Sequence, residues 1–132
     1  MIVKALIKNI DLLDEFEGIV QLEINGNMYK AFYFGEDFTP GQVVTVEFGH
    51  LDLDDEFDWD ATFNQNEYKE CKLIPRDNNE WSYTGYGKII AINPVVADFG
   101  DIKLDLGDWT NDLKVIGQYI SWEIQRLEIC TA

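Results

Sequence analysis

The stretch Gly41-Gln-Val-Val-Thr-Val-Glu-Phe-Gly-His-Leu-Asp-Leu53 matches a second stretch without a gap, Gly117-Gln-Tyr-Ile-Ser-Trp-Glu-Ile-Gln-Arg-Leu-Glu-Ile129. Apolar and polar residues alternate in both, and a period of two is typical of a β-strand with one buried face. The apolar positions then change parity at the same point of each stretch, at Gly49-His50 and at Gln125-Arg126. The change predicts a β-bulge or a sharp bend at both places.

A weaker similarity lies upstream of this match, where Gly18–Ile24 aligns with Gly100–Leu106. The length of the chain fits one domain that can bury a core of its own. We therefore expect a single domain, residues 1–132, with an internal repeat of about residues 4–53 and 86–129 joined by an acidic segment.

The other local signals are also β. Asn25-Gly26-Asn27 is typical of a hairpin turn, and Tyr68–Ile74 indicates a strand that ends at Pro75. The best helix signal is short, at residues 110–116. The sequence predicts an all-β fold, a small antiparallel barrel or sandwich built from two similar halves, with at most one or two short helices. The strand entry Pro40-Gly-Gln-Val-Val44 resembles those of OB-type and other small barrels.

The charge of the chain limits its partners. The 132 residues include 25 acidic and 10 basic side chains, for a formal charge of −15. Such a surface repels nucleic acid and anionic membranes and attracts basic proteins. Because 46% of the residues are apolar, the charge belongs to a folded domain rather than to a disordered tail. No apolar run approaches the roughly 20 residues of a membrane span, and the N-terminus lacks a secretory signal, so we expect a cytoplasmic protein.

The densest charge is the stretch Asp52-Leu-Asp-Asp-Glu-Phe-Asp-Trp-Asp60. Alternate residues of an extended chain lie about 6.6 Å apart on one side, which is close to the spacing of phosphates along a nucleic-acid strand. Phe57 and Trp59 would face the other side, either as binding hot spots or as anchors to the core. The predicted partner-binding residues are Asp52, Asp54, Asp55, Glu56, Asp58, Trp59 and Asp60. The alternative is a solvated acidic loop that the two aromatic residues hold against the core.

A second acidic segment contains Asp98, Asp101, Asp105, Asp108, Trp109 and Asp112. Its last members lie near the predicted helix start, where the helix dipole favours acids. A structural role is therefore the competing explanation for this segment.

Catalytic and metal-binding motifs are weak. The single histidine, His50, aligns with Arg126 in the other copy, so we predict no catalytic residue and no cofactor. A calcium loop counted from Asp54 needs Gly sixth and Glu twelfth, but Trp59 and Gln65 stand there, so we predict no metal site and leave weak calcium binding open. The two cysteines, Cys71 and Cys130, are expected to be free thiols.

Small size, strong acidity, β-richness and the absence of a catalytic set resemble the immunity proteins that neutralise bacterial toxins. The resemblance implies a stoichiometric inhibitor that presents carboxylates to the basic surface of a protein partner, such as a nuclease toxin. We expect a monomer or a homodimer, since the exposed strand edges of an incomplete second half could pair between chains. The alternative is a small β-barrel that binds a small molecule or oligosaccharide in an aromatic-lined mouth, formed by Tyr29, Tyr33, Trp81, Tyr83 and Tyr86.

Overall fold

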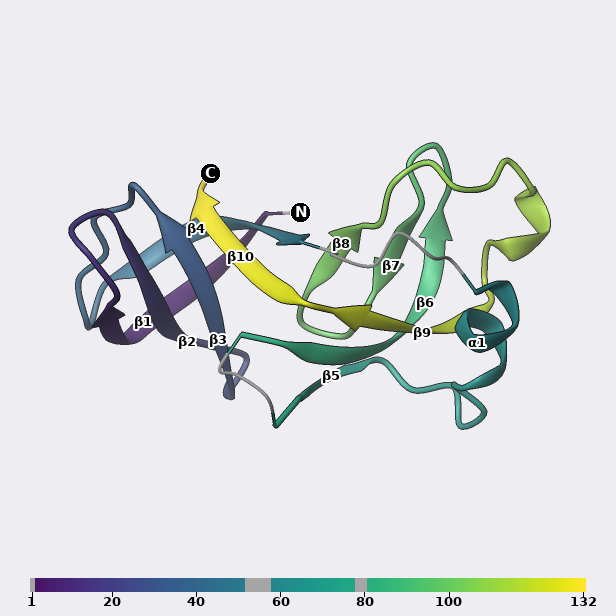
Figure 1. The fold of residues 1–132 in the computed structure, drawn as a ribbon, viewed down its shortest axis with the longest axis horizontal. Helices are drawn as coiled ribbons and strands as arrows, with labels where there is room; N and C mark the ends of the chain where they lie inside the picture. Colours follow the sequence, from purple (N-terminus) through teal and green to yellow (C-terminus); the bar gives the residue numbers. More distant parts are fainter. Residues whose placement is uncertain (1, 52–57, 78–80) are drawn as a thin grey trace.

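The computed structural model describes residues 2–51, 58–77 and 81–132, and it shows a closed five-stranded barrel beside a second, curled sheet (Figure 1). The barrel contains β1 (Ile2–Leu12), β2 (Glu17–Ile24), β3 (Asn27–Phe34), β4 (Val43–Leu51) and β10 (Arg126–Thr131). The second sheet contains β5 (Lys72–Pro75), β6 (Tyr83–Ala91), β7 (Val96–Asp98), β8 (Lys103–Asp105) and β9 (Tyr119–Ile124). The described helices are α1 (Trp59–Asn64) and the 3-10 turn η1 (Leu113–Val115). The predicted fold class is confirmed.

The barrel closes in the order β1-β2-β3-β10-β4, with β4 returning to β1. All of its neighbouring strands are antiparallel except β3 and β10, which are parallel. The β2–β3 hairpin turns at Asn25 and Gly26, with φ of 52° and 82°, as a two-residue turn requires. The strand that completes the barrel therefore comes from the C-terminal end of the chain.

The two sheets share one backbone pattern. In the first sheet Leu6 of β1 lies opposite Val43 of β4, and in the second Lys88 of β6 lies opposite Tyr119 of β9. The same two hydrogen bonds flank each pair: Ile7 N donates to Gln42 O at 2.8 Å and Gly41 N to Ile7 O at 2.8 Å, while Ile89 N donates to Gln118 O at 2.9 Å and Gly117 N to Ile89 O at 2.8 Å. Gly41 and Gly117 have φ of 89° and 90°. The halves are therefore similar in register as well as in sequence.

The hairpins differ from the sequence alignment in one respect. Leu22 of β2 lies opposite Tyr29 of β3, and Ala97 of β7 lies opposite Leu104 of β8. The β7–β8 hairpin thus corresponds to the β2–β3 hairpin. The expected match of residues 18–24 with residues 100–106 is wrong, because β8 takes the place of β3 and β7 takes the place of β2.

Two other expectations need correction. Residues 110–116 form only the short η1, which begins after Asp112, since the Asp112 Oδ1 accepts the Lys114 N–H at 3.0 Å. The parity change is a break at Gln125, between β9 and β10, as predicted. β4 instead runs unbroken through Gly49 to Leu51 in regular pairing with β10.

The two sheets share one core, since the buried apolar residues of both form a single cluster. Polar contacts also join the two sheets. The Tyr83 hydroxyl of β6 donates to Lys30 O at 3.1 Å and accepts from Lys30 N at 2.8 Å. The Asp101 carboxylate of the β7–β8 turn accepts from Asn25 Nδ2 at 3.0 Å, Asn27 Nδ2 at 2.8 Å and the Tyr29 hydroxyl at 2.6 Å. We call this last group the Asp101 latch.

Candidate functional site

The structure describes three of the predicted partner-binding residues: Asp58, Trp59 and Asp60. Asp52, Asp54, Asp55 and Glu56 lie outside the described residues, so the geometry of the site starts at Asp58.

Asp58 begins α1. Its backbone is extended, with φ of −107° and ψ of 105°, and its Oδ1 accepts the Ala61 N–H at 3.2 Å. The carbonyl of Asp58 accepts from Thr62 N at 3.0 Å and from Thr62 Oγ1 at 2.9 Å. The expected extended row of carboxylates is therefore wrong from this point onward, because the N-cap of Asp58 turns the chain into a helix. Asp60 lies in the first turn, where the helix dipole favours an acid.

Trp59 is the outer member of an aromatic cluster, which we define as Trp59, Phe63, Trp109 and Trp122. The Trp59 ring lies 4.6 Å from Phe63 and 5.8 Å, edge to face, from Trp109. Trp109 is stacked on Trp122 of β9 at 5.8 Å. The inner three pack against the core, whereas Trp59 is 44% exposed. The cluster thus presents one indole to solvent on a support of three half-buried rings.

The cluster joins two acidic segments that are about fifty residues apart in the chain. α1 lies against β9 at one end of the molecule (Figure 1), and Trp109 reaches it from the loop after β8. Asp58 and Asp60 flank Trp59, and Asp108 precedes Trp109, and all three acids are exposed. The sequence contained a signal for this contact, since each tryptophan stands between or beside aspartates, but it could not show that the two segments meet.

Most of the second acidic segment has a structural role. Asp98 Oδ1 accepts Gly100 N at 2.8 Å, Asp105 Oδ1 accepts Gly107 N at 2.9 Å, and Asp112 caps η1. Asp101 belongs to the latch. Burial would raise the pKa of Asp101, but hydrogen bonds from Tyr29, Asn25 and Asn27 outweigh it and lower that pKa. Asp108 is the member that adds charge beside the aromatic cluster.

The other predicted positions lie apart from this site. His50 Nε2 is 2.9 Å from the Asp105 carbonyl oxygen, so the ring joins β4 to β8. Tyr29, Tyr33 and Tyr83 are buried in the core, and Trp81 and Tyr86 are half-buried. Burial therefore leaves little of Tyr29, Tyr33 and Tyr83 exposed for contact with a ligand. Cys71 and Cys130 are exposed free thiols, as expected.

A cavity of about 360 Å³ lies between the start of β3, β5 and the β7–β8 turn. Its lining includes Tyr29, Cys71, Phe99 and Asp101. Within residues 2–51, 58–77 and 81–132, no group of three or more His, Cys, Asp or Glu side chains is placed to hold a metal ion. In the same residues, no helix has the length and apolar character needed to cross a bilayer.

No protein-family model, curated protein or solved structure matches the chain. The physical character of the site is therefore the basis for a functional assignment.

Proposed function

We propose that this protein is a non-catalytic acidic binding protein, a stoichiometric inhibitor of the toxin-immunity type, whose partner is a basic protein. One observation carries the proposal: Trp59 is 44% exposed between Asp58 and Asp60, on a preformed support of Phe63, Trp109 and Trp122. A large aromatic side chain with fixed neighbours is the usual centre of a protein-binding hot spot.

The charge supports a basic partner. A formal charge of −15 attracts a basic surface over a screening length of roughly 8–10 Å at physiological salt. Such attraction mainly raises the association rate and opposes acidic competitors. The strand order of the barrel and its single parallel pair also support an OB-type barrel, and the charge disfavours the nucleic acid that such barrels often bind.

The support beneath Trp59 reduces the cost of binding. Asp58 caps α1, and Trp109 and Phe63 hold the indole, so little side-chain freedom remains to be lost when a partner covers it. Burial of the exposed part of one tryptophan, with charged neighbours at the rim, fits the division of an interface into an apolar centre and a polar edge.

The test is capture of a partner from the source organism's lysate on the immobilised protein, followed by binding kinetics with the purified partner. We expect one basic protein, retained stoichiometrically through a low-salt wash. Trp59→Ala should speed its dissociation, whereas Tyr68→Ala, which removes an 80% exposed aromatic side chain outside the cluster, should not. Asp58→Asn with Asp60→Asn should slow association and flatten its salt dependence more than Glu23→Gln with Asp77→Asn does.

Retention of only a diffuse set of basic proteins, all lost together as salt rises, would contradict the proposal. So would a captured partner whose dissociation is the same from Trp59→Ala and from wild type. Asn at position 58 keeps a side-chain oxygen for the helix cap, so the charge variants preserve α1.

A further inference from the structure

The β1–β2 hairpin is longer than its counterpart in the second sheet. β1 and β2 stay paired beyond Asn9 and Gln21 as far as Leu12 and Gly18, whereas the chain turns directly after Ala91 of β6, which is paired with Val96 of β7. The connection itself is the short segment between Leu12 and Glu17. The longer pairing therefore carries this connection outward at the end of the barrel.

This end of the barrel exposes large apolar side chains. We call the group the hairpin-end patch and define it as Leu12 (69% exposed), Leu13 (49%), Phe16 (59%) and the neighbouring Phe34 of β3 (65%). The Phe16 and Phe34 rings lie 6.5 Å apart. Single exposed apolar residues are ordinary on protein surfaces, but several at one end of a hairpin mark an interaction surface.

Hydrogen bonds hold the connection in one shape. The Asp14 Oδ1 accepts Phe16 N at 2.8 Å and Glu17 N at 2.9 Å. Leu13 N donates to Glu17 O at 3.0 Å, and the carbonyl of Phe16 accepts Gly35 N at 2.7 Å, which ties the loop to the end of β3. The patch is therefore presented on an ordered loop, and binding there orders little further chain.

The surrounding charge selects the occupant. Asp11, Asp14, Glu15 and Glu17 lie in or beside the connection, with no basic residue between them, and Glu36 and Asp37 follow Phe34. A second copy of the chain brings the same acids and is repelled. A partner segment with an apolar side chain flanked by Lys or Arg satisfies both the rings and the carboxylates.

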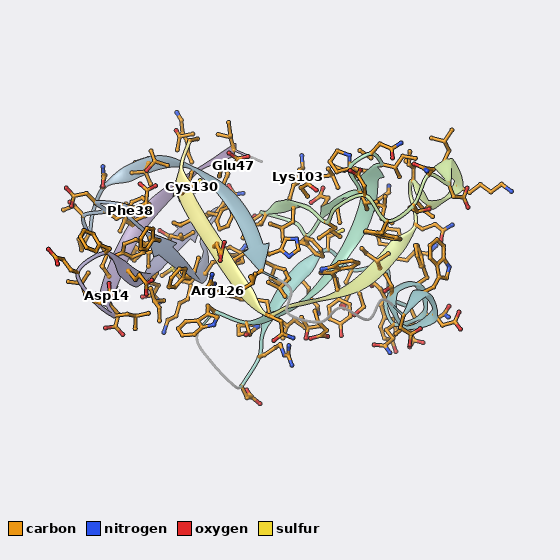
Figure 2. The ribbon with its side chains drawn as sticks, turned by 45° about the horizontal axis from the view of Figure 1, so that its top comes forward. Asp14, Phe38, Glu47, Lys103, Arg126 and Cys130 are labelled. Atoms are coloured by element: carbon orange, nitrogen blue, oxygen red, sulfur yellow. The ribbon has the colours of Figure 1, made fainter. Side chains whose placement is uncertain are left out.

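We propose that the hairpin-end patch is a second docking surface, for a protein segment with an apolar anchor between basic residues. It lies at the other end of the molecule from α1 and Trp59 (Figure 1), and Figure 2 shows Asp14 at the outer end of the barrel. The proposal does not rest on the function proposed above, because it uses different residues and a separate surface.

The test is a fluorescence titration with a short labelled peptide built only of Leu and Lys, with a Leu and Glu peptide of equal length as the charge control. We expect the basic peptide to bind the wild type and the acidic peptide not to bind. The double variant Phe16→Ser, Phe34→Ser should weaken binding by about tenfold or more, which corresponds to about 1.4 kcal/mol. Val43→Ser removes an apolar side chain that is 66% exposed on the same barrel and should leave the affinity unchanged.

Tyr68→Ala, which removes an exposed aromatic side chain outside both surfaces, should also leave the peptide affinity unchanged. Absence of binding to the basic peptide would overturn the proposal. Equal affinity of the double variant and of wild type would also overturn it, because the peptide would then be held by general charge attraction alone. A wild-type dimer in sedimentation analysis that the double variant abolishes would also overturn it, because a second copy would then cover the patch. Thermal unfolding of the double variant checks that it is folded. We expect it to fold, because both substituted side chains are exposed in the wild type.

Discussion

Asp101→Ala should destabilise the protein more than the loss of any ordinary surface acid. The Asp101 carboxylate accepts three hydrogen bonds from the other sheet: from Asn25, Asn27 and Tyr29, at 2.6 to 3.0 Å. The two asparagines are exposed and can bind water instead, so each contributes about 0.5 kcal/mol. The bond from the buried Tyr29 contributes about 1 kcal/mol. The expected loss is about 2 kcal/mol, which for a domain of this size lowers Tm by about 8 °C.

The assay is thermal and urea unfolding of Asp101→Ala beside Asp108→Ala, which removes the same charge at an exposed position outside the latch. The hydrogen bonds hold the pKa of Asp101 below its ordinary value, so its stabilisation is complete above about pH 4 and is lost as the pH falls through the lowered pKa. The difference between wild type and Asp101→Ala should therefore shrink below about pH 4. Equal stability of the two variants at pH 7, or a difference that does not change in acid, would refute the latch.

Three further perturbations test the packing and the binding surface. Gly85→Ala places its Cβ 2.7 Å from Cε1 of Phe99 and should lower the free energy of unfolding in urea by about 1–3 kcal/mol. The control Gly49→Ala meets nothing within 4 Å and should be close to neutral. Equal effects of the two variants would contradict the close packing of Gly85 against Phe99. Burial raises the pKa of the Tyr29 hydroxyl most, and the hydrogen bond to Asp101 and the charge of Asp101 raise it further. The free energy of unfolding should therefore fall as the pH rises above about 10, the ordinary pKa of tyrosine. Tyr29→Phe should reduce that fall in a pH series of Tm values. Trp59→Ala should weaken the affinity for a captured partner about thirtyfold, which corresponds to a hot spot of about 2 kcal/mol. The variant should still unfold cooperatively. Loss of the fold would instead show that Trp59 belongs to the core.

Local sequence signals predicted several of the strands and turns, because these depend on neighbouring residues, although the strand expected at Tyr68–Ile74 is only Lys72–Pro75. Asn25-Gly26 supplied the two positive φ values of a hairpin, and Gly41 and Gly117 marked the same turn in both halves. The pairing of Leu6 with Val43, and of Lys88 with Tyr119, was not predicted, because it joins strands that are distant in the sequence.

The candidate site was harder to predict because its parts depend on capping and on distant contacts. Asp58 reads as one more acid in a row, yet its carboxylate caps α1 and turns the chain away from an extended path. The contact of Trp59 with Trp109 joins segments that no periodicity connects. The charge of the region was therefore predictable, whereas the exposed indole on an aromatic support required the fold.

The closure of the barrel shows why the two halves behave as one unit. β9 ends at Ile124, and the chain continues after Gln125 as β10, which completes the barrel of the other half. In the sequence alignment His50 corresponds to Arg126 and Leu51 to Leu127. The structure pairs Leu51 with Arg126 and His50 with Leu127. If each residue is replaced by its counterpart in the other half, the first pair becomes the second and the second becomes the first.

Such an exchange indicates an approximate two-fold relation between the halves. The Asp101 latch agrees with it, because the β2–β3 and β7–β8 turns that meet there are corresponding turns. We infer that the halves are copies of one unit. Because the first copy needs β10, at the end of the second copy, to close its barrel, the copies fold together, and their loops are free to differ. Trp109 of the aromatic cluster and Phe16 of the hairpin-end patch lie in such differing loops, on the frame that the copies share.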